Sequence, residues 1–336
     1  MKPLLERLEE GPLLYDGAFG TELFARGIEL PNSAVANQLH PDAVVDIHRS
    51  YIEAGSGMIH ANTFVGSPLH LEMADPDADA GRIAALAAAH ARRAVAESGR
   101  DVYVAGSIGP SPGAIEADAG DTDFGIPDAK VRDAHQRVAE ALAEGGVDLF
   151  VIETMFSANE AAMAVDVARR FGLPVALCLT YKYTRDRTTR EIVYRTDWGH
   201  SAEDLLEILA SGEHSGGDDL LESVDLLGLN CGAEQRRREH TGMPYALLGI
   251  EQLNAAMDAR GMVRKKTIAY PNAGMPRLDE QQRTVYSQTP EEMAGEVPAL
   301  LAAGAAVVGG CCGTGPEHIR GFAAAMDGAG PQGQEE

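Results

Sequence analysis

The chain has 336 residues, of which 45% are hydrophobic, and its 28 basic and 51 acidic side chains give a net charge of −23. This charge would repel nucleic acids and anionic membranes, so neither is expected as a partner and work on small molecules is favoured. No stretch approaches the roughly 18 apolar residues of a membrane-spanning helix, and the first residues lack the pattern of a secretory signal. We therefore expect a cytoplasmic protein.

Short apolar runs alternate along the chain with segments of helical periodicity, a pattern typical of repeated βα units and a parallel sheet. Eight runs are predicted as strands: Leu13–Tyr15, Met58–Ala61, Val102–Gly106, Leu149–Ile152, Pro174–Leu179, Leu226–Leu229, Thr267–Tyr270 and Ala306–Val308. Helices are predicted at Asp42–Ala54, Asp79–Ser98, Asp128–Glu144, Ala158–Arg170, Ala202–Leu209, Leu248–Arg260, Pro290–Ala303 and Glu317–Met326.

Eight strands, each followed by a helix, describe a single α/β domain of the (β/α)8 TIM-barrel class. A doubly wound sheet fits less well, because the turn after the first strand, DGAFGTEL, lacks the GxGxxG spacing. We predict a barrel over residues 1–326 and a disordered tail over 327–336. The longest insertions are expected after strands five and six, at 183–200 and 232–247, and a loop at 210–219 is expected on the opposite side of the barrel.

Unusual residues follow the predicted strands, at the barrel end where catalytic groups of this fold lie. These strand-end groups are Asp16-Gly17-Ala18, Asn62-Thr63-Phe64, Ser107-Ile108-Gly109-Pro110, Glu153-Thr154, Asn230-Cys231-Gly232, Asn272-Ala273-Gly274 and Cys311-Cys312-Gly313. The fourth cysteine, Cys178, falls in the middle of a strand and is expected to pack in the core. The barrel therefore brings Cys231, Cys311 and Cys312 to one rim.

Three cysteines on one rim fit a catalytic zinc site, which usually has three protein ligands and one open position. Adjacent residues of a strand point to opposite faces, so Cys311 and Cys312 can share a metal only beyond the strand's end, where nearby glycines let the backbone turn. Two other interpretations stay open from spacing alone. The thiols are either buried and inert, or Cys311 and Cys312 form a redox-responsive vicinal pair.

A zinc ion bound by three thiolates carries a charge of about −1 and is a poor Lewis acid for a carbonyl. It can, however, deprotonate a bound thiol, whose free pKa is near 8.5, and leave the sulfur nucleophilic at neutral pH. The natural reaction of such a thiolate is attack on an activated methyl group.

The segments DGAFGTEL, ANTF, AGSIGP, VIETMF, GLNCG, AYPNAG and VGGCCGTGPEHI resemble, in order and across nearly the whole chain, the homocysteine S-methyltransferase family. The resemblance implies a (β/α)8 barrel, a zinc ion bound by Cys231, Cys311 and Cys312, and methyl transfer to homocysteine to give methionine. It also implies that Asp16 and Glu153 hold and orient the ammonium group of the amino acid.

The residues themselves leave simpler roles open. Asp16 can cap the turn after the first strand, and Glu153 can serve as a buried ion-pair partner. We expect the backbone N–H groups of Gly17 and Ala18 to meet the substrate carboxylate. Asn230 either braces neighbouring loops or contacts the ligand, and His60 is expected to be mainly structural.

The methyl donor stays open among methylcobalamin or a separate corrinoid protein, S-methylmethionine, S-adenosylmethionine and betaine. Tyr181, Tyr183, Tyr194 and Trp198, in or beside the insertion after strand five, suggest a cation–π cage for a sulfonium or quaternary ammonium donor. The alternative from another class is a non-catalytic or redox-responsive protein that uses the vicinal pair Cys311-Cys312. A homo-oligomer is compatible with either hypothesis.

Overall fold

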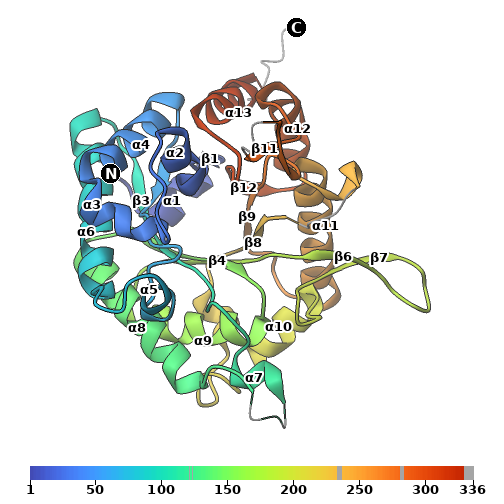
Figure 1. The fold of residues 1–336 in the computed structure, drawn as a ribbon. Coiled ribbons are helices and arrows are strands. Elements are labelled where there is room, and N and C mark those ends of the chain that lie inside the picture. The colour runs from blue at the N-terminus through green and yellow to red at the C-terminus, as the bar shows by residue number, and fades with distance from the viewer. Residues whose placement is uncertain (121, 123, 233–236, 281–283, 329–336) are drawn as a thin grey trace, which may run out of the picture.

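The computed structural model describes the whole chain except residues 121, 123, 233–236, 281–283 and 329–336. Eight parallel strands form its central sheet in the order β1-β12-β9-β8-β5-β4-β3-β2. They are β1 (Leu13–Leu14), β2 (Met58–His60), β3 (Tyr103–Ile108), β4 (Leu149–Met155), β5 (Val175–Leu179), β8 (Leu226–Cys231), β9 (Lys266–Pro271) and β12 (Ala305–Val308). The sheet curves into a nearly closed barrel, which confirms the predicted fold (Figure 1).

The seam between β1 and β2 is bridged by two hydrogen bonds. The Gly57 N–H donates to the Leu14 carbonyl at 2.9 Å. The His60 N–H donates to Oδ2 of the Asp16 side chain, also at 2.9 Å. A carboxylate therefore takes part in closing the barrel at its catalytic end.

Helices surround the barrel (Figure 1). They are α1 (Leu4–Glu9), α2 (Phe19–Ala25), α3 (Ala36–Leu39), α4 (Pro41–Ala54), α5 (Pro68–Ala74), α6 (Ala80–Ser98), α7 (Glu116–Ala119), α8 (Asp128–Glu144), α9 (Ala158–Ala168), α10 (Ala202–Ser211), α11 (Met243–Ala259), α12 (Pro290–Ala302) and α13 (Pro316–Gly328). The eight predicted helices are all present. The largest difference is α11, which begins five residues before the predicted Leu248, with a proline in its first turn.

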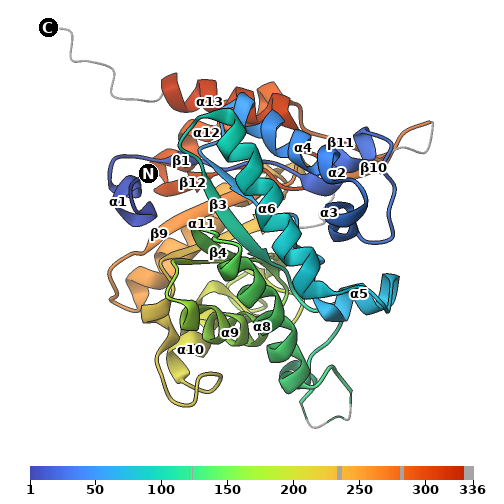
Figure 2. The ribbon, with the colours of Figure 1, turned by 90° about the vertical axis from the view of Figure 1, so that its left-hand side faces the viewer.

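The core has two layers, as alternation along buried strands requires. One set of strand side chains fills the barrel interior, and Leu4 and Leu8 of α1 pack against it from the N-terminal end. The other set packs against the surrounding helices. Cys178 lies fully buried in the interior set, so its predicted packing role is confirmed. Figure 2 shows α1 at the end of the barrel opposite α5 and the β10–β11 hairpin.

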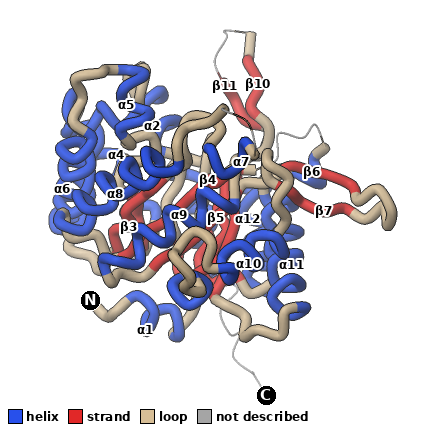
Figure 3. Tube along the Cα trace, turned by 90° about the horizontal axis from the view of Figure 1, so that it is seen from below, coloured by secondary structure: helices blue, strands red, loops and turns tan. Residues whose placement is uncertain are grey.

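Two antiparallel hairpins project from the barrel (Figure 3). The insertion predicted at 183–200 contains most of β6 (Lys182–Arg185) and all of β7 (Ile192–Arg195). The second hairpin, β10 (Pro276–Leu278) and β11 (Thr284–Tyr286), follows β9 and was not predicted. The loop predicted at 210–219 is present from residue 212, because α10 continues to Ser211, and it leads through a short 3-10 helix (Leu220–Ser223) to β8.

The other predicted segments fall partly outside the described residues. The insertion predicted at 232–247 includes 233–236, and the tail predicted at 327–336 includes 329–336, which the structure does not describe. Helix α13 continues to Gly328, two residues past the predicted end of the barrel. None of the helices in the described part of the chain is long and apolar enough to cross a membrane.

Candidate active site

A cavity of about 190 Å³ at the C-terminal ends of the strands collects most of the predicted site residues. Asp16 enters it after β1, Glu153 from β4 and Cys231 from the end of β8. Cys311 and Cys312 reach it from the turn after β12. The elements that carry these groups are far apart in the sequence, and the barrel brings them to one rim as predicted.

The Sγ atoms of Cys231, Cys311 and Cys312 all lie within 4.8 Å of one another. Cys231 adopts φ +60°, a conformation that turns the chain out of β8 at this residue. After β12 the glycines are required for space. A Cβ on Gly313 would lie 2.2 Å from the Tyr286 ring, and one on Gly310 would lie 2.3 Å from Thr314 Oγ1. The turn that presents the vicinal pair therefore depends on glycine.

The geometry and chemistry of this cluster fit a metal ion. Sulfurs bound to a tetrahedral zinc at about 2.3 Å stand about 3.8 Å apart, which lies within the range that this cluster spans. Hydrogen bonds from the other two thiols hold the pKa of Cys312 well below its usual range. The same neighbours, together with burial, raise the pKa of Cys311. Three thiolates at this distance need a cation to ionise together, and all three remain partly accessible from the cavity.

Asp16 and His60 form an ion pair inside the cavity. His60 Nδ1 lies 2.8 Å from Asp16 Oδ1, and the His60 N–H bonds the other carboxylate oxygen. Burial lowers the pKa of His60, but the charge and hydrogen bond of Asp16 outweigh it and raise that pKa to about 9. Burial raises the pKa of Asp16, against the opposing effect of His60. The sequence predicted a mainly structural role for His60 and did not place it in the site, because its pairing with Asp16 follows from the fold.

Glu153 is buried and hydrogen-bonded from three elements. The Ser107 hydroxyl of β3 donates to Oε1. Oε2 accepts from the Asn230 amide at 3.3 Å and from the Tyr270 hydroxyl at 3.4 Å. Burial raises the pKa of Glu153, while the nearby His60 charge and the Ser107 bond oppose that rise. The side chain is thus held in one orientation at the wall of the cavity.

Asn230 is fully buried and does not line the cavity. Its amide bonds the backbone N–H and the hydroxyl of Thr154 as well as Glu153. Of the two roles left open by the sequence, the structure supports the brace and gives no support to ligand contact.

Gly17 and Ala18 line the cavity. The Ala18 N–H donates to the Thr314 carbonyl at 2.9 Å, and its contact with a substrate carboxylate stays a prediction. Gly17 matters for space, because a Cβ there would lie 2.7 Å from that same carbonyl oxygen and 2.9 Å from the Tyr51 ring.

A second cavity, of about 240 Å³, shares Thr154, Cys231 and Cys312 with the first. Of the four aromatic residues predicted to form a cage, only Tyr181 lines it. Trp198 lines a third cavity, and Tyr183 and Tyr194 pack around His240. The four do not come together as one cage.

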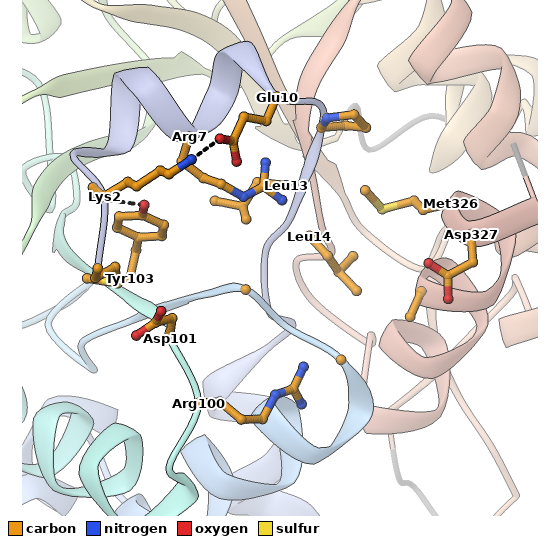
Figure 4. Close-up of a pocket in the computed structure, with 15 residues that line it drawn as sticks. Lys2, Arg7, Glu10, Leu13, Leu14, Arg100, Asp101, Tyr103, Met326 and Asp327 are labelled. Carbon is orange, nitrogen blue, oxygen red and sulfur yellow. Dashed lines mark hydrogen bonds and ion pairs between the residues drawn. The ribbon is translucent and has the colours of Figure 1, made fainter. Parts of the chain in front are cut away.

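A cavity of about 560 Å³ lies at the opposite, N-terminal end of the barrel, between α1 and the end of α13 (Figure 4). Lys2 forms an ion pair with Glu10 at its edge, and the Tyr103 hydroxyl donates to the Lys2 carbonyl at 2.7 Å. None of the cysteines lines it. The chemistry of this fold class takes place at the other end, so this cavity is not the candidate active site.

Comparison with known proteins agrees with this geometry. The sequence profile of the family described as homocysteine S-methyltransferase matches residues 13–326. The chain is 30% identical to methionine synthase of Mycobacterium leprae and 31% identical to that of Mycobacterium tuberculosis, over 98% and 96% of its length. It spans only about a quarter of each of these relatives, 26% and 25%.

Solved structures show the same fold. The homocysteine methyltransferase MmuM from Escherichia coli, in its metallated form, superposes with a TM-score of 0.68 at 22% identity, over 96% of this chain and 99% of that one. Its oxidized form gives a TM-score of 0.69 over the same shares of the two chains.

Proposed function

The chain belongs to the homocysteine S-methyltransferase family, and we propose that it transfers a methyl group to the thiol of homocysteine to give methionine, with zinc as the cofactor. The observation that carries the proposal is the cluster of Cys231, Cys311 and Cys312 on the wall of a cavity that also contains buried carboxylates. The cluster supplies three thiolate ligands, and the cavity supplies the space in which a substrate sulfur would take the fourth position.

Zinc bound here would make a substrate thiol acidic while leaving its sulfur nucleophilic. The protein's own residues hold the amino acid in place. Glu153 and Asp16 face the cavity as acceptors for the substrate ammonium. Ser107, Tyr270 and Asn230 fix Glu153, and His60 fixes Asp16, so the positions of the acceptors are set before substrate binds.

The methyl donor is proposed to approach through the second cavity, because Cys231 and Cys312 line that cavity as well as the first. Tyr181 and Tyr286 line it, together with the ion pair of Lys182 and Asp197. The candidate donors remain methylcobalamin or a separate corrinoid protein, S-methylmethionine, S-adenosylmethionine and betaine.

The proposed setting is the cytoplasm, where thiols stay reduced. All four cysteines are free in the structure, which supports this setting.

The test is to supply zinc-loaded protein with homocysteine and each candidate donor in turn and to measure methionine. We expect methionine with at least one donor, loss of activity after chelation, and recovery with zinc. The matched control is Cys178→Ala, which changes a buried cysteine outside the cluster and should leave activity intact. Absence of methionine with every donor, or full activity without metal, would contradict the proposal.

A further inference from the structure

The cavity that the cysteine cluster lines contains one basic side chain and two acidic ones. Asp16, Glu153 and His60 line it, and neither lysine nor arginine is among its described lining residues. An α-amino acid brings a carboxylate as well as an ammonium into this space. The two buried carboxylates and the cysteine cluster would repel that anion, so its binding requires a positive partner or strong hydrogen-bond donors.

One of the two ring nitrogens of His60 is available to bind a ligand. Nδ1 is engaged by Asp16 at 2.8 Å, whereas no described residue hydrogen-bonds Nε2. The side chain keeps 14% of its surface exposed, and it lines the cavity. The raised pKa of His60 supports a protonated ring, in which both nitrogens donate.

Tyr15 supplies a second unused donor next to His60. The two rings meet edge to face with centroids 5.9 Å apart. The Tyr15 hydroxyl is buried, has no hydrogen-bond partner among the described residues, and belongs to a residue that lines the same cavity. Burial raises the pKa of Tyr15, so the hydroxyl keeps its proton. A buried donor without a partner is costly, and a ligand acceptor would remove the cost.

We propose that His60 Nε2 and the Tyr15 hydroxyl bind the substrate carboxylate, and so restrict the methyl acceptor to thiols that carry an α-amino acid group. Of the N–H groups of Gly17 and Ala18, which the sequence suggested for this task, that of Ala18 donates to the Thr314 carbonyl. The inference rests on the proposed function, since it concerns the acceptor of that same reaction. Asp16 then has two roles: it attracts the ammonium, and it orients the imidazole through Nδ1.

The test compares three thiols that differ in one group: homocysteine, 3-aminopropanethiol, which lacks the carboxylate, and 4-mercaptobutanoate, which lacks the amine. Their dissociation constants are measured by titration calorimetry on zinc-loaded protein without a methyl donor. The variants are His60→Asn, whose amide can still donate to Asp16 as Nδ1 does, and Tyr15→Phe, which keeps the ring. Circular dichroism and zinc content establish that each variant is folded and loaded.

We expect His60→Asn to weaken the binding of homocysteine and 4-mercaptobutanoate about 10- to 100-fold, because a charge-assisted hydrogen bond is lost. Binding of 3-aminopropanethiol should change less than about threefold, because it lacks the group that His60 would hold. Tyr15→Phe should also weaken the binding of homocysteine and 4-mercaptobutanoate, by a smaller factor.

Equal weakening of homocysteine and 3-aminopropanethiol would show that His60 acts only through Asp16, and would overturn the inference while leaving the proposed function intact. Unchanged homocysteine binding in both variants would also overturn the inference and leave the proposed function intact. Failure of the wild type to bind homocysteine would instead overturn the proposed function, and the inference with it.

Discussion

Asn230 joins the end of β8 to the end of β4 through Thr154: its Oδ1 accepts from the Thr154 N–H at 2.7 Å, and its Nδ2 donates to the Thr154 hydroxyl at 2.6 Å. Thr154 adopts φ +58°, and Cys231, the next residue after Asn230, adopts φ +60°. Such angles are unfavourable for residues with a Cβ and persist only where surrounding contacts impose them. One buried amide therefore stabilises the two strained turns that position Glu153 and Cys231.

We predict that Asn230→Ala lowers the free energy of unfolding by about 2 to 4 kcal/mol, because it leaves the buried Thr154 N–H and the Glu153 carboxylate with fewer partners. The control is Asn254→Ala, which removes a single bond to the Ala303 carbonyl and should cost about 1 kcal/mol. Urea unfolding measures both. Equal costs would show that Asn230 does not support the two turns.

Gly313→Ala should displace the turn that carries the vicinal cysteines. Gly313 has φ +83°, and an added Cβ would lie 2.2 Å from the Tyr286 ring. Gly304→Ala is the matched control, since Gly304 has φ +98° with open space around it. We expect the control to lose about 1 to 2 kcal/mol of stability and keep its metal. Gly313→Ala should lose most of its zinc. Equal metal content in the two variants would contradict this assignment.

His48 gives the fold an acid-sensitive element. It is fully buried in α4 beside Phe19, and neither ring nitrogen has a hydrogen-bond partner among the described residues. Burial lowers its pKa from 6.5 to about 3. Between these values the unfolded chain binds a proton that the folded chain does not, so stability falls as the pH drops below 6.5.

We predict that His48→Leu removes this dependence. Between pH 6.5 and 4.5 the wild type should lose about 2.3 kcal/mol more stability than the variant, with a slope that rises toward about 1.4 kcal/mol per pH unit. Denaturant unfolding at several pH values measures the two slopes. Identical slopes would show that His48 is protonated in the folded state.

Glu153→Gln should weaken homocysteine binding while the protein retains its metal, because the carboxylate is assigned to the ammonium and not to zinc. A factor of about 10 to 100 is expected from loss of a charged partner. Glu160→Gln is the control, since Glu160 is also a buried carboxylate but pairs with His135 at 3.2 Å in another part of the protein. Titration calorimetry measures homocysteine binding, and metal analysis measures the zinc content. Loss of zinc from Glu153→Gln would contradict the assignment of this carboxylate to the ammonium.

The strands and the rim cysteines were predictable because each depends on local signals. Buried parallel strands are continuous apolar runs, and in a barrel every such run must end at the same rim. The order of the motifs along the chain is therefore enough to predict that Asp16, Glu153 and the three cysteines lie near one another.

The missed features depend on tertiary contacts. All residues of the β10–β11 hairpin strands except Tyr286 are exposed, so no apolar run marks the hairpin. His60 differs from a structural histidine only through Asp16, which lies 44 positions earlier in the sequence. Whether the Ala18 N–H is free depends on Thr314, from the far end of the chain. Such partners follow from the closed fold and cannot be identified from local pattern.

In the proposed site, Cys231, Cys311 and Cys312 hold zinc with one position open to the thiol of homocysteine. Zinc-edge X-ray absorption of the purified protein tests it most directly, with and without homocysteine. We predict three sulfur neighbours at about 2.3 Å and one lighter neighbour in the free protein, and four sulfur neighbours after homocysteine is added. A zinc ion with fewer than three sulfur neighbours, or a neighbour set that homocysteine leaves unchanged, would contradict the account.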